Sequence, residues 1–239
     1  GPASLLPMAP QELMRRRAAP LRLVIFDWDG VLVDSDPVAN RVVARDLAEL
    51  GWVMTPELAN DTFLGMTLTD MQPVIEARLG RAVPEGWKQG LMRRLVEAMA
   101  IEARAIPGAV EALHGVRALG LPWRIASNSS HEEMRVKFRC IGIATLVEGR
   151  VHSHRDVGRG KPAPDLFLAT AAAEGVAPAD CVVIEESLTG ARAAAAAGMD
   201  CLGYAPHADG AALRAVGAVP FGSMFDVPAL VALGRGGVA

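Results

Sequence analysis

The sequence predicts an α/β protein built on a doubly wound parallel sheet, with an inserted all-helical domain. Strand-like runs recur at 23–26, 121–127, 146–151, 181–184 and 199–204. After residue 107 these runs alternate with helical patterns, which is typical of parallel strands joined by right-handed crossovers. Residues 37–103 instead carry helical patterns without a convincing strand. We therefore expect a core formed by residues 18–36 and 104–234, interrupted by a helical insertion at 37–103.

The insertion is expected to begin soon after the first strand. Asp36 is the predicted N-cap of its first helix, with Pro37 in the first turn, and the helical spacing continues to Leu50 before Gly51 ends it. Three more helical runs follow in the insertion, at 56–63, 68–79 and 84–103. In the core, helices are expected at 107–119, 130–141, 164–174 and 188–197.

Composition and charge narrow the possible partners. The 239 residues are 51% hydrophobic and 21% charged, which is ordinary for a globular protein with a sizeable core. Lys and Arg total 24 against 27 Asp and Glu, so the chain has no broad basic field for nucleic acid. Its only basic run, Arg15-Arg16-Arg17, is expected to be a solvated tail or a helix start. No apolar stretch is long enough to span a bilayer, so a membrane is not expected as a partner either.

The cysteines favour a reducing compartment. Cys140, Cys181 and Cys201 are far apart and form no CxxC pair, so neither a zinc site nor a disulfide framework is expected. Residues 1–20 lack the basic start and apolar middle of a secretory signal. We expect a cytoplasmic protein that is a monomer or a small homo-oligomer.

Two aspartates follow the first strand. Asp27 and Asp29 come directly after the apolar run, and Gly30 lets the chain turn sharply there. In open α/β sheets ligands bind at this edge. Carboxylates held so close repel each other unless a cation lies between them, and Mg²⁺, which prefers oxygen ligands, is the simplest such cation. A strand followed by an acidic turn is the alternative.

A serine-rich turn follows the second strand-like run. Ser127, Asn128, Ser129 and Ser130 precede a predicted helix, and Ser129 has capping-box spacing to Glu132. A helix N-terminus offers free N–H groups and the positive end of a dipole to a phosphate, and the Ser127 hydroxyl could donate to the same anion. A plain helix cap is the alternative.

Lys161 and an acidic pair complete the candidate site. Lys161 stands between Gly160 and Pro162 in a loop that enters a helix, which suits a fixed ionic role toward carboxylate and phosphate oxygens. The loop is not a Walker A motif, because Lys161 is followed by Pro162 rather than Ser or Thr. Glu185 and Glu186 follow the fourth apolar run, where they can reach a metal or simply start the next helix. Four such clusters at strand ends together favour one shared site.

In this order the motifs resemble those of the haloacid dehalogenase (HAD) superfamily. They read DxDGxLxDS, a strand-end serine, GKPxPD, and an acidic pair after an apolar strand. The likeness covers about residues 21–230. It implies a Rossmann-like HAD core at 18–36 and 104–234 and, at 37–103, the small helical cap of subfamily I, next to the beta-phosphoglucomutase-like phosphatases.

The resemblance also implies an activity and a role for each motif. It implies a Mg²⁺-dependent phosphatase for a small phosphorylated metabolite, such as a sugar, sugar-acid or polyol phosphate. Asp27 would be the nucleophile that forms an aspartyl-phosphate, and Asp29 the general acid and then the base. Ser127 and Lys161 would hold the transferring phosphoryl group. The implied Mg²⁺ ligands are Asp27, the backbone carbonyl of Asp29, Glu186 and, directly or through water, Glu185.

Substrate contacts are expected from the core and from the cap. The candidate substrate-binding residues are Gly30, Asn128, Asn40, Met66 and Thr67, and Arg41 and Arg45 are further cap residues of interest.

Several positions depart from the family pattern. The acidic pair is Glu-Glu rather than Glu-Asp, which changes the reach of the second ligand. Ala39 or Asn40 occupies the place of the mutase's cap histidine, and Leu68 that of its phosphate-gripping arginine, which favours hydrolysis over phosphate shuttling. True haloacid dehalogenases lack the second aspartate, so Asp29 argues against dehalogenation. The alternatives are a beta-phosphoglucomutase-like phosphomutase and a non-catalytic protein that binds a phosphometabolite.

Overall fold

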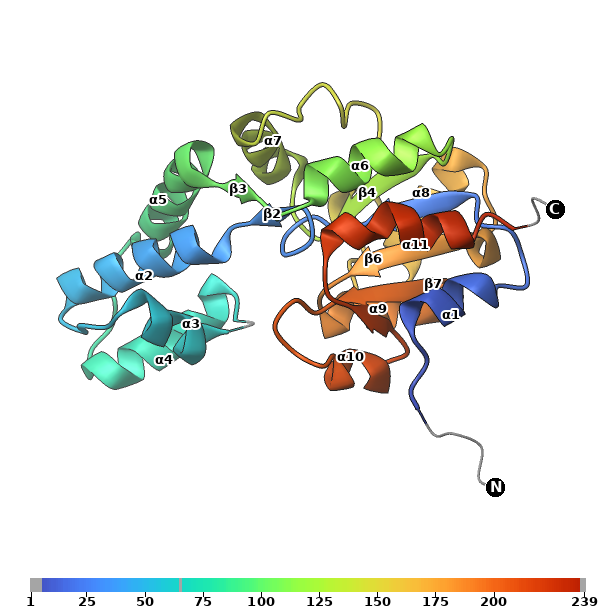
Figure 1. Cartoon of the computed structure of the whole chain (residues 1–239). Helices are drawn as coiled ribbons and strands as arrows, with labels where there is room; N and C mark the ends of the chain where they lie inside the picture. Colours follow the sequence, from blue (N-terminus) through green and yellow to red (C-terminus); the bar gives the residue numbers. More distant parts are fainter. Residues whose placement is uncertain (1–5, 65, 237–239) are drawn as a thin grey trace. The chain divides into compact units, whose positions relative to one another are not determined.

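The protein has an α/β core and a helical insertion, which confirms the predicted fold class. A computed structural model describes residues 6–64 and 66–236. Six parallel strands form one sheet in the order β5-β4-β1-β6-β7-β8. Figure 1 labels its strands β4, β6 and β7. The bounds of the six strands are β1 Leu23–Phe26, β4 Trp123–Ser127, β5 Val151–Ser153, β6 Cys181–Glu185, β7 Asp200–Tyr204 and β8 Val219–Phe221.

Strand β1 lies at the centre of the sheet, between β4 and β6. Phe26 is the register partner of Ile125 on one side and of Ile184 on the other. The chain runs outward from β1 to β4 and β5, and then returns to the opposite side for β6, β7 and β8. The direction of the connections therefore reverses at β1, and ligands of open α/β sheets bind at the carboxyl ends of the strands at such a point.

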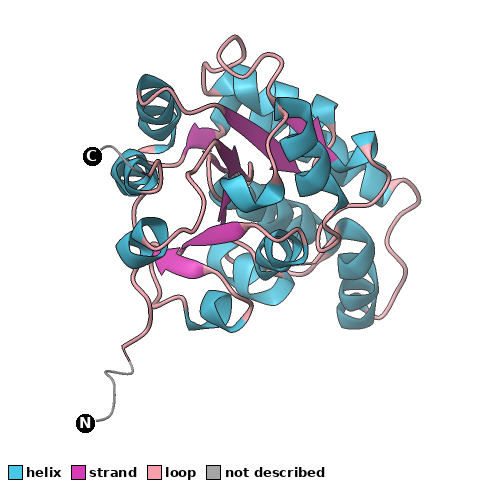
Figure 2. Ribbon diagram, turned by 90° about the vertical axis from the view of Figure 1, so that its right-hand side faces the viewer, coloured by secondary structure: helices cyan, strands magenta, loops and turns pink. Residues whose placement is uncertain are grey.

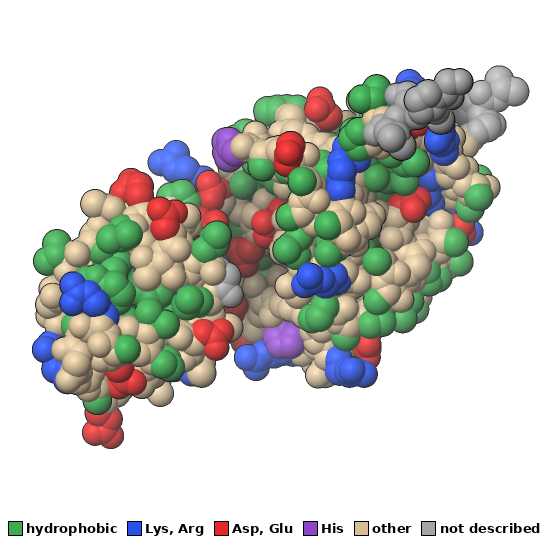
Figure 3. Space-filling model, turned by 90° about the horizontal axis from the view of Figure 1, so that it is seen from below, with side chains coloured by type: hydrophobic (Ala, Val, Ile, Leu, Met, Phe, Trp, Pro, Cys, Tyr) green, Lys and Arg blue, Asp and Glu red, His purple; other side chains and the backbone are tan. Residues whose placement is uncertain are grey.

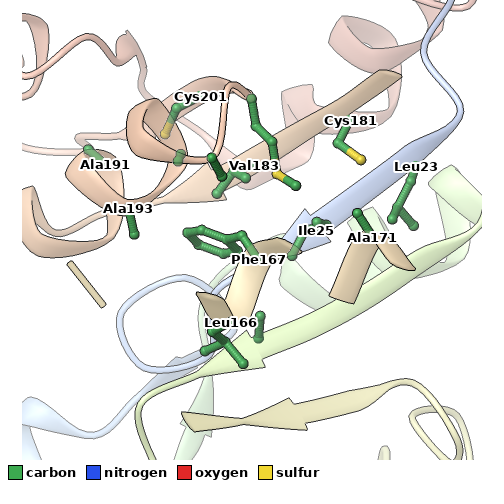
Figure 4. Packing of buried hydrophobic residues seen from close by; sticks show 14 of the residues in the cluster. Leu23, Ile25, Leu166, Phe167, Ala171, Cys181, Val183, Ala191, Ala193 and Cys201 are labelled. Atoms are coloured by element: carbon green, nitrogen blue, oxygen red, sulfur yellow. The ribbon is translucent and has the colours of Figure 1, made fainter. Parts of the chain in front are cut away.

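Helices cover both faces of this sheet (Figure 2). All four residues of β1 are buried, and because successive side chains point to opposite faces, both faces must be covered. On one face, Leu23 and Ile25 share a cluster with Phe167 of α8 (Asp165–Glu174) and with alanines of α9 (Leu188–Ala196), as Figure 4 shows. The other helices outside the insertion are α1 Pro10–Arg15, α6 Ala109–Ala118, α7 His131–Cys140, α10 Ala211–Ala215 and α11 Val227–Leu233.

The insertion has a hydrophobic core of its own. It contains α2 (Asp36–Leu50), α3 (Pro56–Phe63), α4 (Leu68–Leu79) and α5 (Trp87–Glu102). Buried side chains from all four helices form one cluster, among them Leu47, Phe63, Ile75 and Leu91. Inside it, the buried carboxylate of Asp46 on α2 accepts a hydrogen bond from Trp87 Nε1 at 2.7 Å and pairs with Arg94, which ties α2 to α5.

The chain divides into two compact units. One consists of the described residues up to Val33, of Ala105–Arg135 and of the described residues from Ile143 onward, and the other of Asp34–Arg104 and Val136–Gly142. The chain crosses from one unit to the other at a two-stranded sheet of β2 (Val33–Asp34) and β3 (Arg104–Ala105). The end of α7 groups with the insertion, whereas the sequence pattern placed it in the core.

The structure corrects three local predictions. The strand expected at 146–151 is wrong: Val147 N–H bonds to Ile143 O and Arg150 N–H to Val147 O, so this segment forms successive turns and β5 begins only at Val151. Asp36 is not an N-cap but the first residue of α2, after Ser35. The helix expected at 84–103 begins at Trp87. A segment as short as 146–151 fits a strand and a turn equally well, because periodicity needs a longer segment.

The basic run near the N-terminus is only partly solvated. The side chain of Arg17 is buried and donates to Asp200 Oδ2 at 2.6 Å and to the carbonyl of Ala179 at 2.9 Å. Arg16, in contrast, is exposed and pairs with Glu12. The expectation of a solvated tail or a helix start is therefore wrong for Arg17, which follows α1 and anchors its end to the sheet.

On the face shown in Figure 3, basic, acidic and apolar side chains are interspersed. Within residues 6–64 and 66–236, no helix combines the length and the apolar character needed to cross a membrane.

Candidate active site

Three adjacent strand ends bring the predicted polar residues together. Asp27 directly follows β1, Ser127 ends β4, and Glu185 ends β6. Lys161 comes from the loop that precedes α8. All four are buried although they are polar or charged, and Glu185 is completely inaccessible. Buried charges need partners, so this group must be paired internally.

The Lys161 ammonium is the centre of this group. Its Nζ lies 2.8 Å from Asp27 Oδ1, 2.8 Å from Glu185 Oε2 and 2.8 Å from the carbonyl oxygen of Ala126. These three acceptors use all three donors of an ammonium. The Phe167 ring lies below the charge, with its centroid 4.9 Å from Nζ. Lys161 is therefore fixed in position, as the sequence predicts.

The electrostatics of this group favour an additional cation. Burial lowers the pKa of Lys161, but the Asp27 and Glu185 carboxylates outweigh that effect and raise it above its ordinary value, so the ammonium stays charged. Burial, followed by the Glu185 charge, raises the pKa of Asp27 well above its usual range, although Lys161 acts in the opposite direction. Two buried carboxylates share one ammonium, and a cation beside Asp27 would balance the excess negative charge.

Glu185 is a structural partner of Lys161. Its Oε1 accepts hydrogen bonds from the backbone N–H of Glu186 at 3.2 Å and from Ser187 Oγ at 3.2 Å, while Oε2 faces Lys161. The first turn of α9 makes room for this carboxylate, because a Cβ added to Gly190 would lie 1.8 Å from Glu185 Oε2. Both oxygens are thus engaged by the protein, so we expect any contribution of Glu185 to a metal to be indirect.

Asn128 holds the backbone of Lys161. Its Nδ2 donates to the Lys161 carbonyl at 3.1 Å, and its Oδ1 accepts from the Lys161 N–H at 2.9 Å. A Cβ added to Gly160 would lie 2.6 Å from Oδ1, so only glycine fits beside this amide. The sequence predicts that Asn128 binds the substrate, whereas in the structure its side chain is hydrogen-bonded to the backbone of Lys161.

The serine-rich turn is arranged differently from the prediction. Ser130, not Ser129, caps α7, because Ser130 Oγ accepts from the Glu133 N–H at 3.2 Å. Ser127 Oγ accepts the N–H of Ser129 at 3.0 Å, and Ser129 Oγ donates to Asp29 Oδ2 at 3.1 Å. The predicted capping box of Ser129 and Glu132 is therefore wrong by one residue, since α7 starts one residue later than its sequence spacing suggested.

The residues present fit a divalent metal with oxygen ligands. A Cβ added to Gly30 would lie 2.7 Å from Glu186 Cδ, so the Glu186 carboxyl group lies against the loop that carries Asp27 and Asp29. Among the described residues no three His, Cys, Asp or Glu side chains gather into a metal site. The available donors are instead two carboxylates, Asp27 and Glu186, and the carbonyl of Asp29. So few protein ligands suit Mg²⁺, which keeps several of its waters.

In the insertion, the structure gives the predicted cap residues local partners. Asn40 Nδ2 donates to Asn60 Oδ1 at 3.0 Å, and both residues line a cavity of about 250 Å³ together with Met66. Thr67 does not line this cavity; its Oγ1 accepts the Asp70 N–H at 3.1 Å and caps α4.

Sequence reasoning missed Phe167, Ser187 and Gly190 as members of the site, and it gave Ser129 only a capping role. Ser187 and Gly190 carry a readable signal, since a serine three residues before a glycine directly after a strand fits a tight helix start. Phe167 looks like any core residue, and the contact of Ser129 depends on the meeting of two strand ends.

Comparison with known proteins identifies the family. A profile of the haloacid dehalogenase-like hydrolases matches residues 21–198, most of the chain. The chain belongs to this family. Hexitol phosphatase A of Escherichia coli (strain K12) is 31% identical over 189 residues, which cover 77% of this chain and 83% of that protein.

Solved structures agree with this assignment. A HAD family hydrolase from Deinococcus radiodurans R1, with bound phosphate and sodium, is 34% identical with a TM-score of 0.80, covering 91% of this chain and 98% of that one. A provisional beta-phosphoglucomutase from Thermotoga maritima is 25% identical with a TM-score of 0.78, covering 89% and 99%. Our chain is a HAD phosphatase of subfamily I, in the beta-phosphoglucomutase-like group.

Proposed function

We propose that the protein is a Mg²⁺-dependent phosphatase that hydrolyses a small phosphorylated metabolite through an aspartyl-phosphate at Asp27. The observation that carries this proposal is the buried contact of Lys161 Nζ with Asp27 Oδ1. That contact holds one carboxylate oxygen and leaves Oδ2 as the attacking atom. A fixed positive charge also lies where phosphoryl oxygens would gather, which stabilises negative charge in the transition state.

In the first step, Asp27 Oδ2 attacks phosphorus and the ester P–O bond breaks. The electron pair stays on the ester oxygen, which takes a proton from the Asp29 carboxylic acid. The Ser127 hydroxyl donates a hydrogen bond to a phosphoryl oxygen, and the Lys161 ammonium, whose three protons already have acceptors, stabilises the negative charge of the phosphoryl group. In the second step, a water attacks the phosphorus of the aspartyl-phosphate and gives a proton to Asp29, while the P–O bond to Asp27 breaks and its electron pair returns to the Asp27 carboxylate. Inorganic phosphate leaves, and both aspartates return to their starting states.

Asp27, Glu186 and the Asp29 carbonyl would hold the Mg²⁺. When bound, the metal supplies positive charge that offsets the repulsion between the Asp27 carboxylate and an incoming phosphate. The excess of buried carboxylate over ammonium at Asp27, Glu185 and Lys161 supports this assignment.

We propose a sugar, sugar-acid or polyol phosphate as the substrate. The similarity to a protein named for hexitol phosphate hydrolysis supports this class. A small helical cap suits a compact substrate, which it can seclude from water while the phosphoryl group moves.

A panel of phosphorylated metabolites, assayed for phosphate release with and without Mg²⁺, tests the proposal. We expect Mg²⁺-dependent hydrolysis of at least one sugar, sugar-acid or polyol phosphate. Asp27→Asn should abolish release, while Asp226→Asn, at an exposed position outside the motifs, should keep it. No hydrolysis across the panel would overturn the proposal. Conversion of a hexose 1-phosphate to its 6-phosphate without phosphate release would instead establish the mutase alternative.

A further inference from the structure

We infer that Ser129 is a positioning residue that holds Asp29 and determines which of its carboxylate oxygens gives the proton to the leaving group. The inference rests on the proposed function, since it concerns the acid of that reaction. Its starting observation is the 3.1 Å hydrogen bond from Ser129 Oγ to Asp29 Oδ2, between residues 100 positions apart.

The backbone of Ser129 is fixed from two strands. Its N–H donates to Ser127 Oγ at 3.0 Å, at the end of β4. Its carbonyl accepts a 2.6 Å hydrogen bond from Ser153 Oγ, at the end of β5. The backbone of Ser129 is thus held at both its N–H and its carbonyl, and this fixed backbone positions the side chain that contacts Asp29.

Ser153 is itself firmly oriented. It is completely buried, and its hydroxyl accepts the Arg155 N–H at 3.3 Å while donating to Ser129. Asp156 closes the turn by accepting the Ser153 N–H at 2.9 Å. Since the Ser153 hydroxyl has one proton and that proton faces Ser129, the link between β5 and the serine turn has a single arrangement.

Ser130 leaves the Ser129 hydroxyl available to bind Asp29. Because Ser130 Oγ caps α7, the Ser129 hydroxyl is not needed at the helix start and donates to the carboxylate instead. A serine hydroxyl carries one proton, so a donor to Oδ2 makes that oxygen the poorer base. In the proposed reaction Oδ1, the oxygen turned away from Ser129, would carry the acid proton. As the ester P–O bond breaks, that proton moves from Oδ1 to the leaving oxygen.

Two aryl phosphates of similar size separate this role from a purely structural one. Loss of phenolate from phenyl phosphate needs an acid, since a phenol has a pKa of about 10, whereas the nitro group makes p-nitrophenolate a good leaving group without one. Ser129→Ala should lower kcat/KM for phenyl phosphate about 10-fold and change kcat/KM for p-nitrophenyl phosphate by less than about twofold. Ser129→Thr, which keeps the hydroxyl, should restore phenyl phosphate hydrolysis.

The matched control is Ser130→Ala, which removes the adjacent buried hydroxyl without touching Asp29. It should change kcat/KM for both substrates by the same factor, as a structural defect would. In an Asp29→Asn background, Ser129→Ala should not lower kcat/KM for phenyl phosphate further, because the acid is already absent. The inference would be overturned if Ser129→Ala lowered kcat/KM equally for both substrates. It would also be overturned if Ser129→Ala lowered kcat/KM for phenyl phosphate further in the Asp29→Asn background.

Failure of the proposed function would be visible separately. If the unaltered protein releases no phosphate from either aryl ester or from the metabolite panel, the phosphatase proposal fails. Crystal structures of the unaltered protein and of Ser129→Ala then still decide the positioning role. We expect the Asp29 carboxylate to face Ser129 in the first and to turn away in the second; an unmoved carboxylate would contradict it.

Discussion

The Nζ atom of Lys161 lies 2.8 Å from Asp27 Oδ1, although 134 residues separate the two in the sequence. The same nitrogen lies 2.8 Å from Glu185 Oε2. One ammonium therefore joins the end of β1 to the end of β6. Its removal should affect both the folding energy and the chemistry.

We predict that Lys161→Met lowers the free energy of unfolding by about 3 kcal/mol, because it leaves two buried carboxylates without their cation. It should also lower kcat for phosphate release at least about 100-fold. Urea denaturation and a phosphate assay measure the two effects. Lys88→Met removes an exposed lysine of the cap and should cost less than about 1 kcal/mol. Equal stability of the two variants would contradict the assigned role of Lys161.

The metal assignment predicts a specific effect of Glu186. Glu186→Gln should raise the Mg²⁺ concentration that gives half-maximal activity at least about 10-fold, since the site loses a charged ligand. EDTA should abolish the activity, and added Mg²⁺ should restore it. Glu148→Gln, in an exposed turn, should keep the original Mg²⁺ dependence. An unchanged Mg²⁺ titration for Glu186→Gln would show that this residue does not bind the metal.

A substitution of Gly190 tests how closely helix α9 packs against the Glu185 carboxylate. Gly190→Ala places a methyl group where Glu185 Oε2 now lies, so the carboxylate must move away from Lys161. We expect a loss of about 2 kcal/mol in unfolding free energy and reduced phosphate release. Gly90→Ala is the matched control in helix α5, where a Cβ meets no atom closer than 3.5 Å. That change should stabilise the protein by about 0.5 kcal/mol, because alanine favours a helix interior over glycine. Similar effects of the two changes would exclude the proposed crowding.

The lowered pKa of His152 predicts that the stability of the protein depends on pH. Burial, followed by the positive charge of Arg124, lowers the pKa of His152 from its ordinary value of 6.5, while Asp156 acts in the opposite direction and His131 adds to the lowering. The folded state therefore binds this proton less readily than the unfolded state. The contribution to stability is fully present above pH 6.5 and is lost as the pH falls through the lowered value in the folded state.

We accordingly expect the free energy of unfolding to decrease between pH 7 and pH 5, and to decrease less in His152→Gln. Urea denaturation at several pH values measures both slopes. His207→Gln, which changes an exposed loop histidine, should keep the slope of the unaltered protein. The same slope for His152→Gln and the unaltered protein would rule out His152 as its source.

Much of this architecture follows from local patterns in the sequence. The runs 23–26 and 181–184 are apolar throughout, as strands covered on both faces must be. The helical insertion shows regular spacing, and glycine ends two of its helices. Polar residues after those strands predict the candidate site, because the carboxyl ends of parallel strands meet at one edge. Such signals are readable because each depends on neighbouring residues alone.

The tertiary structure decided how those polar groups are paired. Glu185 is next to Glu186 in the sequence, yet its two oxygens are held by Lys161 and by the start of α9. Ser129 is predicted as a helix cap, yet it donates to Asp29 because Ser130 takes the capping position. Strand order and register set these distances between residues far apart in the chain. The sequence therefore determined which chemical groups reach the sheet edge, and only the packing of the strands decided which of them meet.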